Sequence, residues 1–324
     1  MGDGARSLLM RVLSGAGCPP VRMKCFTIRC FLLWCCWWVS AASVEAGISS
    51  HDEQENGSRS WERLLVEAER LQVPTKFLRV VPPDFIHFEF DELRTYAAEY
   101  HPGEHRMLLN RTLSLNAAGR VLKPLGRMTH KELEVFYHEL FHAYMDYITV
   151  RDVQLGELGR DSETLLLFAK EQQVCRYGEV MITPIVQRMD EVESRYLTEA
   201  ESWEALNETW AVFVGWVVWN QLELRQQRGE STFRGGQDAH QWIPRFKRAF
   251  ENGEFRGYYV PEEPDERRLA QKRYLAKSSQ LSLEEALAIL EQAFGFSSDF
   301  VKVVDASFGP AWRATCVTGK DGAN

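Results

Sequence analysis

The sequence predicts a predominantly helical α+β fold, with a small N-terminal sheet and two lobes that share a cleft. Three segments carry Ser or Thr followed three residues later by Glu, the capping-box pattern of a helix start. These pairs are Thr129 with Glu132, Thr198 with Glu201 and Ser282 with Glu285. Strand-like runs gather instead between residues 77 and 110. The chain has 324 residues and is 45% hydrophobic, which suffices for one large domain of this kind.

Residues 1–46 read as a secretory signal peptide and are set apart from the fold. A basic start precedes the short apolar run 30–39, and small residues end at Ala46. The run is too short to cross a bilayer, so we expect signal cleavage, no stable membrane span and an exported protein, periplasmic or extracellular. Met23 is the expected true start. Residues 47–60 are then expected to form a flexible mature N-terminus.

Charge and cysteine content limit the partners and the covalent structure. The formal net charge of −8 argues against nucleic acid or an anionic membrane as the main partner. Outside the signal segment only Cys175 and Cys316 remain. In an oxidising compartment they would form one disulfide, and the alternative is two buried thiols. No feature of the sequence specifies an oligomeric state.

The N-terminal lobe is expected over residues 61–150, and three elements precede its main helix. They are a helix over 60–71, strand-like runs over 77–81 and 85–90, and a hairpin over 95–110. In the hairpin, Pro102 followed by Gly103 is typical of a type II turn.

The main helix of this lobe is predicted to begin after Thr129, with apolar residues at helical spacing to about residue 148. Residues four apart share a face, so the imidazoles of His138 and His142 should converge, with Glu139 beside them. Two neutral imidazoles suit zinc, and a catalytic site needs a third protein ligand and an open position for water. The alternative is two histidines on the solvated side of an amphipathic helix.

The segment His138-Glu139-Leu140-Phe141-His142 resembles the His-Glu-x-x-His signature of the zincin metallopeptidases, and the similarity extends over about residues 95–216. The Gly and third His of metzincins are absent from 143–148, so the resemblance is to gluzincins, in which a later helix supplies a Glu ligand. It implies a zincin-like two-lobed domain. It also implies an edge strand, 107–109, that pairs with an extended peptide, although an ordinary core hairpin is equally consistent.

The C-terminal lobe is expected over residues 151–324 and is predicted to be helical. Its helices are expected over 161–177, much of 179–197, 198–228, part of 230–257 and 282–294.

Three carboxylates, Glu201, Glu204 and Glu208, share one face of the long helix predicted to start at Thr198. The apolar run 209–219 follows them, and a carboxylate at the start of a buried helix must be paired or bound to a cation. Asn207 to Ala211 resembles the Asn-Glu-x-x-Ala segment of gluzincins, which selects Glu208 as the third ligand.

Glu204 is the alternative ligand, in which case Glu208 would orient a histidine. With Glu208 as ligand, Val212 stands where the family often has a second acid. A solvated acidic stripe at a helix start remains a further interpretation.

These features together predict an exported zinc-dependent metallopeptidase that acts on a peptide or protein substrate. His138, His142 and Glu208 would hold Zn²⁺, and Glu139 would act as general base. The family commonly adds a Tyr or His that stabilises the oxyanion; His240, Tyr258 and Tyr259 are candidates, and the sequence selects none of them. Two alternatives stay open: a secreted helical binding or scaffold protein with a structural or absent metal site, and a zinc amidase acting on non-protein amides.

Overall fold

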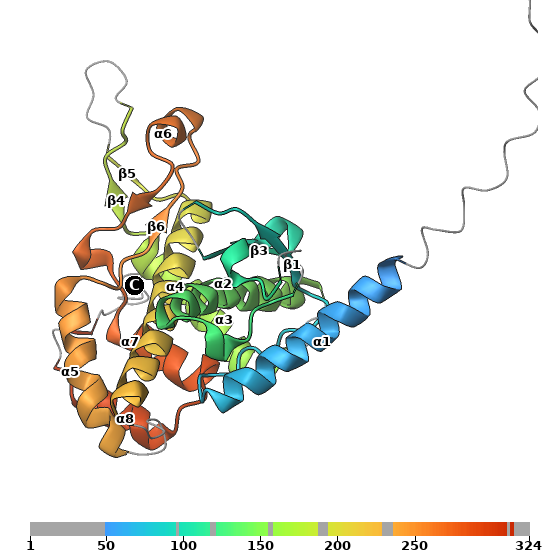
Figure 1. The fold of residues 1–324 in the computed structure, drawn as a ribbon. Coiled ribbons are helices and arrows are strands. Elements are labelled where there is room, and N and C mark those ends of the chain that lie inside the picture. Colours follow the sequence, from blue (N-terminus) through green and yellow to red (C-terminus); the bar gives the residue numbers. More distant parts are fainter. Residues whose placement is uncertain are drawn as a thin grey trace, which may run out of the picture. The chain divides into compact units, whose positions relative to one another are not determined.

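A computed structural model describes residues 49–94, 97–116, 121–154, 158–186, 194–228, 236–309 and 312–313 (Figure 1). Every described residue lies in one compact unit, Ile48–Asn324. The predicted signal segment 1–46, with Met23, therefore falls outside the described residues, and so does Cys316.

The described residues form helices and three small sheets, which confirms the predominantly helical α+β class. The helices are α1 (Ser49–Arg70), α2 (His130–Gln154), α3 (Arg160–Gln172), α4 (Glu199–Arg228), α5 (Gly236–Asn252), α6 (Pro264–Leu269), α7 (Leu283–Ala288) and α8 (Ser298–Ala306). The strands are β1 (His87–Asp91), β2 (Ala98–His101), β3 (Arg106–Asn110), β4 (Met181–Ile182), β5 (Arg195–Tyr196), β6 (Tyr258–Tyr259) and β7 (Arg273–Tyr274). Among the described helices none combines the length and hydrophobicity that a transmembrane span requires.

The N-terminal sheet has the strand order β1-β3-β2, with β1 parallel and β2 antiparallel to β3. The predicted hairpin is confirmed, but residues 107–109 lie in the central strand, so their assignment to the edge is wrong. The edge strand beside α2 is β2, because β1 pairs with β3 from the other side. The turn is a short 3-10 helix, Pro102–Glu104, rather than type II, and His105 takes the left-handed conformation after it.

The predicted strand over 77–81 is wrong, because this segment forms consecutive turns. Phe77, Leu78 and Val81 are all buried, a spacing that fits a helical turn rather than the alternation of a strand. The Phe77 ring packs edge-on against Tyr137 and Phe141 of α2, with ring centroids 6.2 and 5.9 Å apart. Burial against α2 therefore decides the local structure here.

Helices α2 and α4 pack against each other more extensively than any other pair of described elements (Figure 1). Both begin at the predicted capping boxes. Thr129 N donates to Glu132 Oε2 at 2.6 Å, and Thr198 N donates to Glu201 Oε2 at 3.0 Å. The apolar run 209–219 of α4 is buried except at Val212 and Trp219, which are partly exposed, so the predicted core helix is confirmed.

The two helices approach most closely at Gly215 of α4. A Cβ atom there would lie 2.7 Å from the backbone oxygen of Glu134, one turn before His138 on α2. Real Cβ atoms do not tolerate this distance, so a side chain at Gly215 would push the helices apart. The glycine thus sets the separation of the two helices that carry the predicted ligands.

We expect Gly215→Ala to lower the free energy of unfolding by about 1–3 kcal/mol, because the overpacking cost outweighs the gain in helix propensity. Gly126→Ala is the matched control, since a Cβ at Gly126 meets no atom within 4 Å and should change stability by less than about 0.5 kcal/mol. Urea unfolding of both variants measures the difference. Equal stability of the two variants would show that α2 and α4 are not held this close.

Residues 179–197 were predicted to be mostly helical, and this is wrong for the described part. Met181–Ile182 and Arg195–Tyr196 form the antiparallel pair β4 and β5, and residues 187–193 lie outside the described residues. Arg195 donates to both oxygens of Glu201, at 2.6 and 2.8 Å, which fixes β5 to the start of α4. A tertiary ion pair and strand pairing therefore prevail over local helix propensity.

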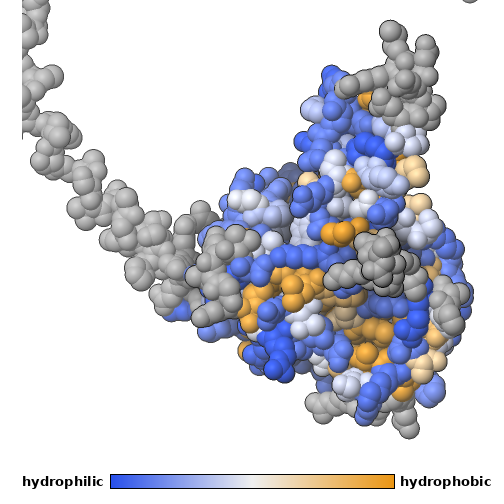
Figure 2. Space-filling model, turned by 180° about the vertical axis from the view of Figure 1, so that it is seen from behind, coloured by the Kyte–Doolittle hydropathy of each residue, from blue (hydrophilic) through white to orange (hydrophobic). Residues whose placement is uncertain are grey.

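The remaining predictions of C-terminal helices are confirmed. Helix α3 continues through a π-helical turn, Gln173–Tyr177, up to Gly178, and Ser282 caps α7 with Glu285. Strands β4 and β5 and helix α6 lie at one end of the unit, and α5 and α8 at the other (Figure 1). The reverse face shows apolar patches on the helical body, whereas hydrophilic residues predominate around β4, β5 and α6 (Figure 2).

Candidate metal centre

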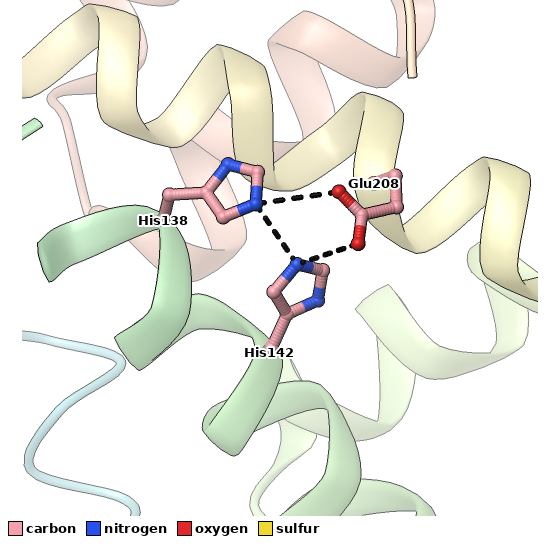
Figure 3. A group of neighbouring side chains, drawn as sticks. All are labelled: His138, His142 and Glu208. Carbon is pink, nitrogen blue, oxygen red and sulfur yellow. Dashed lines mark hydrogen bonds and ion pairs between the residues drawn. The ribbon is translucent and has the colours of Figure 1, made fainter. Parts of the chain in front are cut away.

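Helices α2 and α4 bring together His138, His142 and Glu208, a group that could hold a metal ion. The two imidazoles project from consecutive turns of α2 and meet the carboxylate of Glu208 from α4 (Figure 3). The Nε2 atoms of the two histidines are 3.1 Å apart. Glu208 Oε2 lies 3.3 Å from Nε2 of His138, and Oε1 lies 3.4 Å from Nε2 of His142. The structure thus joins residues about seventy positions apart in the sequence.

The three ligand atoms face a cleft of about 610 Å³. Strand β2, helices α2 and α4 and the β6–β7 segment form its walls. The lining side chains include Glu99, Tyr100, His138, Glu139, His142, Asp146, Trp203, Glu204, Glu208, Val212, Tyr258, Val260, Lys272 and Tyr274. A cleft of this size accepts a small molecule or a short segment of an extended chain.

Glu208 is buried yet ionised. Burial alone would raise the pKa of its carboxyl group, but the adjacent His142 and His138 outweigh burial and hold the pKa well below its usual range. Its Oε2 atom makes no hydrogen bond within the described part of the chain. A buried charged oxygen needs a compensating positive charge, which protonated imidazoles or a bound cation can supply. The group could therefore hold a cation at the point where the three side chains meet.

Glu139 lies beside this point and is held by the edge strand. Its Oε2 atom accepts a hydrogen bond of 2.8 Å from the backbone N–H of Tyr100 in β2. Its Oε1 atom lies 3.9 Å from Nε2 of His138. Burial raises the pKa of Glu139 to about 7, with the charge of Glu208 adding to the rise and His138 opposing it. A carboxylate with a pKa near neutrality is well suited to accept and release a proton.

The other two carboxylates of the predicted face serve other contacts. Glu201 is buried in the ion pair with Arg195, at the start of α4. Glu204 lines the cleft and accepts a hydrogen bond of 2.8 Å from Val260 N. Burial raises the pKa of Glu204, against the effect of that hydrogen bond. Glu204 does not belong to the group whose ligand atoms converge, whereas Glu208 does.

Tyr258 of β6 is a site residue that sequence reasoning considered without selecting it. It lines the cleft, and its hydroxyl group lies next to Glu208. Burial and the charge of Glu208 raise its pKa well above the usual value, so the hydroxyl stays protonated. Lys272 Nζ donates to this hydroxyl oxygen at 2.6 Å. Because an ammonium group can only donate, the proton of Tyr258 must point elsewhere.

Gly257 explains how Tyr258 comes so close to α4. A Cβ atom at Gly257 would lie 2.5 Å from both N and Oγ1 of Thr209, the residue after Glu208. The backbone N–H of Gly257 instead donates to Thr209 Oγ1 at 3.1 Å. A glycine directly before two tyrosines was the available signal for this contact, since glycine permits close approach of two backbones.

The remaining candidates lie away from this centre. Tyr259 is buried on the other side of β6, and His240 is exposed. His105 pairs with Asp146. Cys175 is disulfide-bonded, and Cys316, the partner considered from the sequence, lies outside the described residues.

Comparisons of the chain with protein families, with curated proteins and with solved structures found no match.

Proposed function

We propose that the protein is an exported zinc-dependent metallopeptidase with a zincin-like, gluzincin-type site. One observation carries the proposal: two imidazoles and a buried carboxylate converge within 4.8 Å of one another, with a second, partly buried carboxylate, Glu139, beside them in a cleft. A structural zinc site would have four protein ligands, whereas the described residues supply three, which leaves a position open for water or substrate. The arrangement therefore favours catalysis over a purely structural metal.

The spacing of the ligand atoms fits zinc. Zinc binds nitrogen and oxygen ligands at about 2.0–2.1 Å, which places two ligand atoms of a tetrahedral site roughly 3.3 Å apart. The Nε2 atoms of His138 and His142 are 3.1 Å apart, close to this spacing. The contacts of 3.3 and 3.4 Å reach two different oxygens of Glu208, and one ligand atom from each of the three residues lies within 4.8 Å of the others. Calcium and magnesium prefer oxygen ligands, so the two imidazoles argue against them.

Each side chain has a role that its position supports. When bound, zinc supplies Lewis acidity that polarises a carbonyl group and makes water a stronger acid. Glu139 accepts the proton of the attacking water and delivers it to the leaving amine. Tyr258 donates a hydrogen bond from its hydroxyl group to the oxyanion that develops on the carbonyl oxygen.

The edge strand β2 supports a peptide as the substrate. Ala98, Glu99 and Tyr100 line the cleft, and β2 pairs only with β3 among the described strands. An extended peptide can add to such an edge through main-chain hydrogen bonds. The backbone N–H of Tyr100 already donates to Glu139, so the peptide would pair with the other main-chain groups of this edge. A peptide paired with β2 would have its scissile bond next to the three proposed metal ligands.

Metal analysis tests the metal site directly. We expect the purified chain without its signal segment to bind one zinc ion, and Glu208→Ala to lose it because one of three ligands is missing. Glu204→Ala is the matched control on the same helix and should keep the zinc, since Glu204 contacts Val260 N instead. Zinc retained by Glu208→Ala, or lost only by Glu204→Ala, would contradict the ligand assignment.

A substrate panel tests the activity. We expect hydrolysis of unstructured peptides that a chelator abolishes and added zinc restores. Hydrolysis confined to non-protein amides would favour the amidase alternative. Bound zinc without any hydrolysis would favour a binding or scaffold protein with a structural metal.

A further inference from the structure

Asp146 lies one turn after His142 on α2 and faces the same cleft. Its Oδ2 atom accepts a hydrogen bond of 2.6 Å from the hydroxyl group of Tyr100 and lies 2.8 Å from Nδ1 of His105. The side chain of Asp146 is 14% exposed. One carboxylate oxygen of the active-site helix therefore binds both the edge strand β2 and the turn that follows it.

Tyr100 connects this carboxylate to Glu139. Its side chain donates to Asp146, and its backbone N–H donates to Oε2 of Glu139 at 2.8 Å. The other oxygen of Glu139 is left to face the metal ligands, 3.9 Å from Nε2 of His138. If Tyr100 moved along or away from α2, the carboxylate of Glu139 would lose its hydrogen bond from the Tyr100 backbone N–H.

From these contacts we infer that Asp146 is a positioning residue, which fixes β2 on α2 and so holds the carboxylate of Glu139 in place through Tyr100. The inference rests on the proposed function, because it assigns to Asp146 a part in preparing the general base. A side chain needs supporting contacts of this kind to hold a reacting geometry within a fraction of an ångström.

Two further features support the contacts of Asp146 with Tyr100 and His105. Tyr100 is 7% exposed, and burial together with the hydrogen bond to Asp146 raises its pKa, so the hydroxyl remains a donor. His105 adopts a left-handed conformation with φ 49°, which is unfavourable for a residue other than glycine. Its contacts with Asp146 and with the Phe85 ring, 4.3 Å between centroids, hold it there.

Kinetics of Tyr100→Phe, Asp146→Ala and Asp146→Asn test the inference. The first two variants should lower kcat about 10–100-fold with KM within about twofold and zinc retained, because the base is misplaced while the ligands are not. Asp146→Asn should recover most of kcat, since an amide oxygen still accepts from Tyr100. The matched controls, Tyr144→Phe and Asp152→Ala, remove a buried hydroxyl and a carboxylate elsewhere on α2 and should leave kcat unchanged.

Hydrogen exchange of the Tyr100 amide gives a readout independent of activity. The amide should be protected in the wild type and in Asp146→Asn, and should exchange faster in Asp146→Ala. Unchanged protection would overturn the inference, and so would faster exchange with an unchanged kcat, or a loss of zinc in Tyr100→Phe. If the wild type hydrolyses nothing, the proposed function fails, and the exchange result still decides whether Asp146 fixes the strand.

Discussion

Glu139→Gln should lower kcat by about 10²–10⁴-fold while zinc stays bound, because the amide has nearly the same shape as the carboxylate but cannot accept a proton. The carboxylate that is lost lies beside the ligands without being one of them. Glutamine can still accept the hydrogen bond from Tyr100 N, so β2 should keep its place. Steady-state kinetics on an unstructured peptide and metal analysis of the same preparation measure both quantities.

His142→Ala is the contrasting variant. It removes an imidazole that contacts the Glu208 carboxylate at 3.4 Å, so both zinc and turnover should be lost. Full activity in Glu139→Gln with bound zinc would refute the assignment of the base. Loss of zinc in Glu139→Gln would instead mean that Glu139 is a ligand.

The pH dependence of the free energy of unfolding shows whether Glu139→Gln is folded, independently of its catalytic activity. In the metal-free protein the pKa of Glu139 rises from 4.5 to about 7 on folding, chiefly through burial. The folded state therefore holds this proton more tightly than the unfolded state, and the wild type loses stability as pH rises through this range. Metal-free Glu139→Gln lacks this proton, so its stability relative to the wild type should rise as pH increases from 4.5 to 7. The difference should persist at pH 8 and should vanish below pH 4.5.

Local features of the sequence predicted local structure well. The capping boxes at Thr129 and Thr198 mark the starts of α2 and α4, because the reciprocal hydrogen bonds form within one turn. Segment 77–81 was mispredicted because its conformation depends on distant partners, the aromatic rings of α2. Residues 179–197 were mispredicted because β4 pairs with β5 and Arg195 binds the first turn of α4, contacts that helical spacing does not reveal. The parallel pairing of β1 with β3 has no local signature in the sequence either.

At the candidate site, too, residues with a local sequence signal could be predicted and residues placed by the fold could not. Helical spacing brought His138 and His142 to one face, and a carboxylate at the start of a buried helix pointed to Glu208. Tyr258 could not be selected in this way, because it belongs to a two-residue strand whose position depends on the contact between Gly257 and Thr209. The network from Asp146 through Tyr100 to Glu139 likewise joins three residues only after β2 lies against α2.

Tyr258→Phe should lower kcat by about 10²–10³-fold, with zinc retained and KM little changed. The hydroxyl group lies beside Glu208 at the candidate metal centre, and its raised pKa keeps the proton that an oxyanion needs. Lys272 occupies the oxygen as a donor, so the proton of Tyr258 is directed away from Lys272 and toward Glu208, on the side where the oxyanion would bind. The loss should fall on kcat because negative charge develops on the carbonyl oxygen only in the transition state.

Tyr259→Phe is the matched control, since it removes the same atom from the next residue of β6. Tyr259 is buried away from the cleft, and its hydroxyl has no hydrogen-bond partner in the described part of the chain. Its removal should change kcat by less than about twofold, because no interaction with the reacting groups is lost. Equal losses in the two variants would mean that β6 acts only through packing, and the donor to the oxyanion would then have to be sought among other side chains that line the cleft.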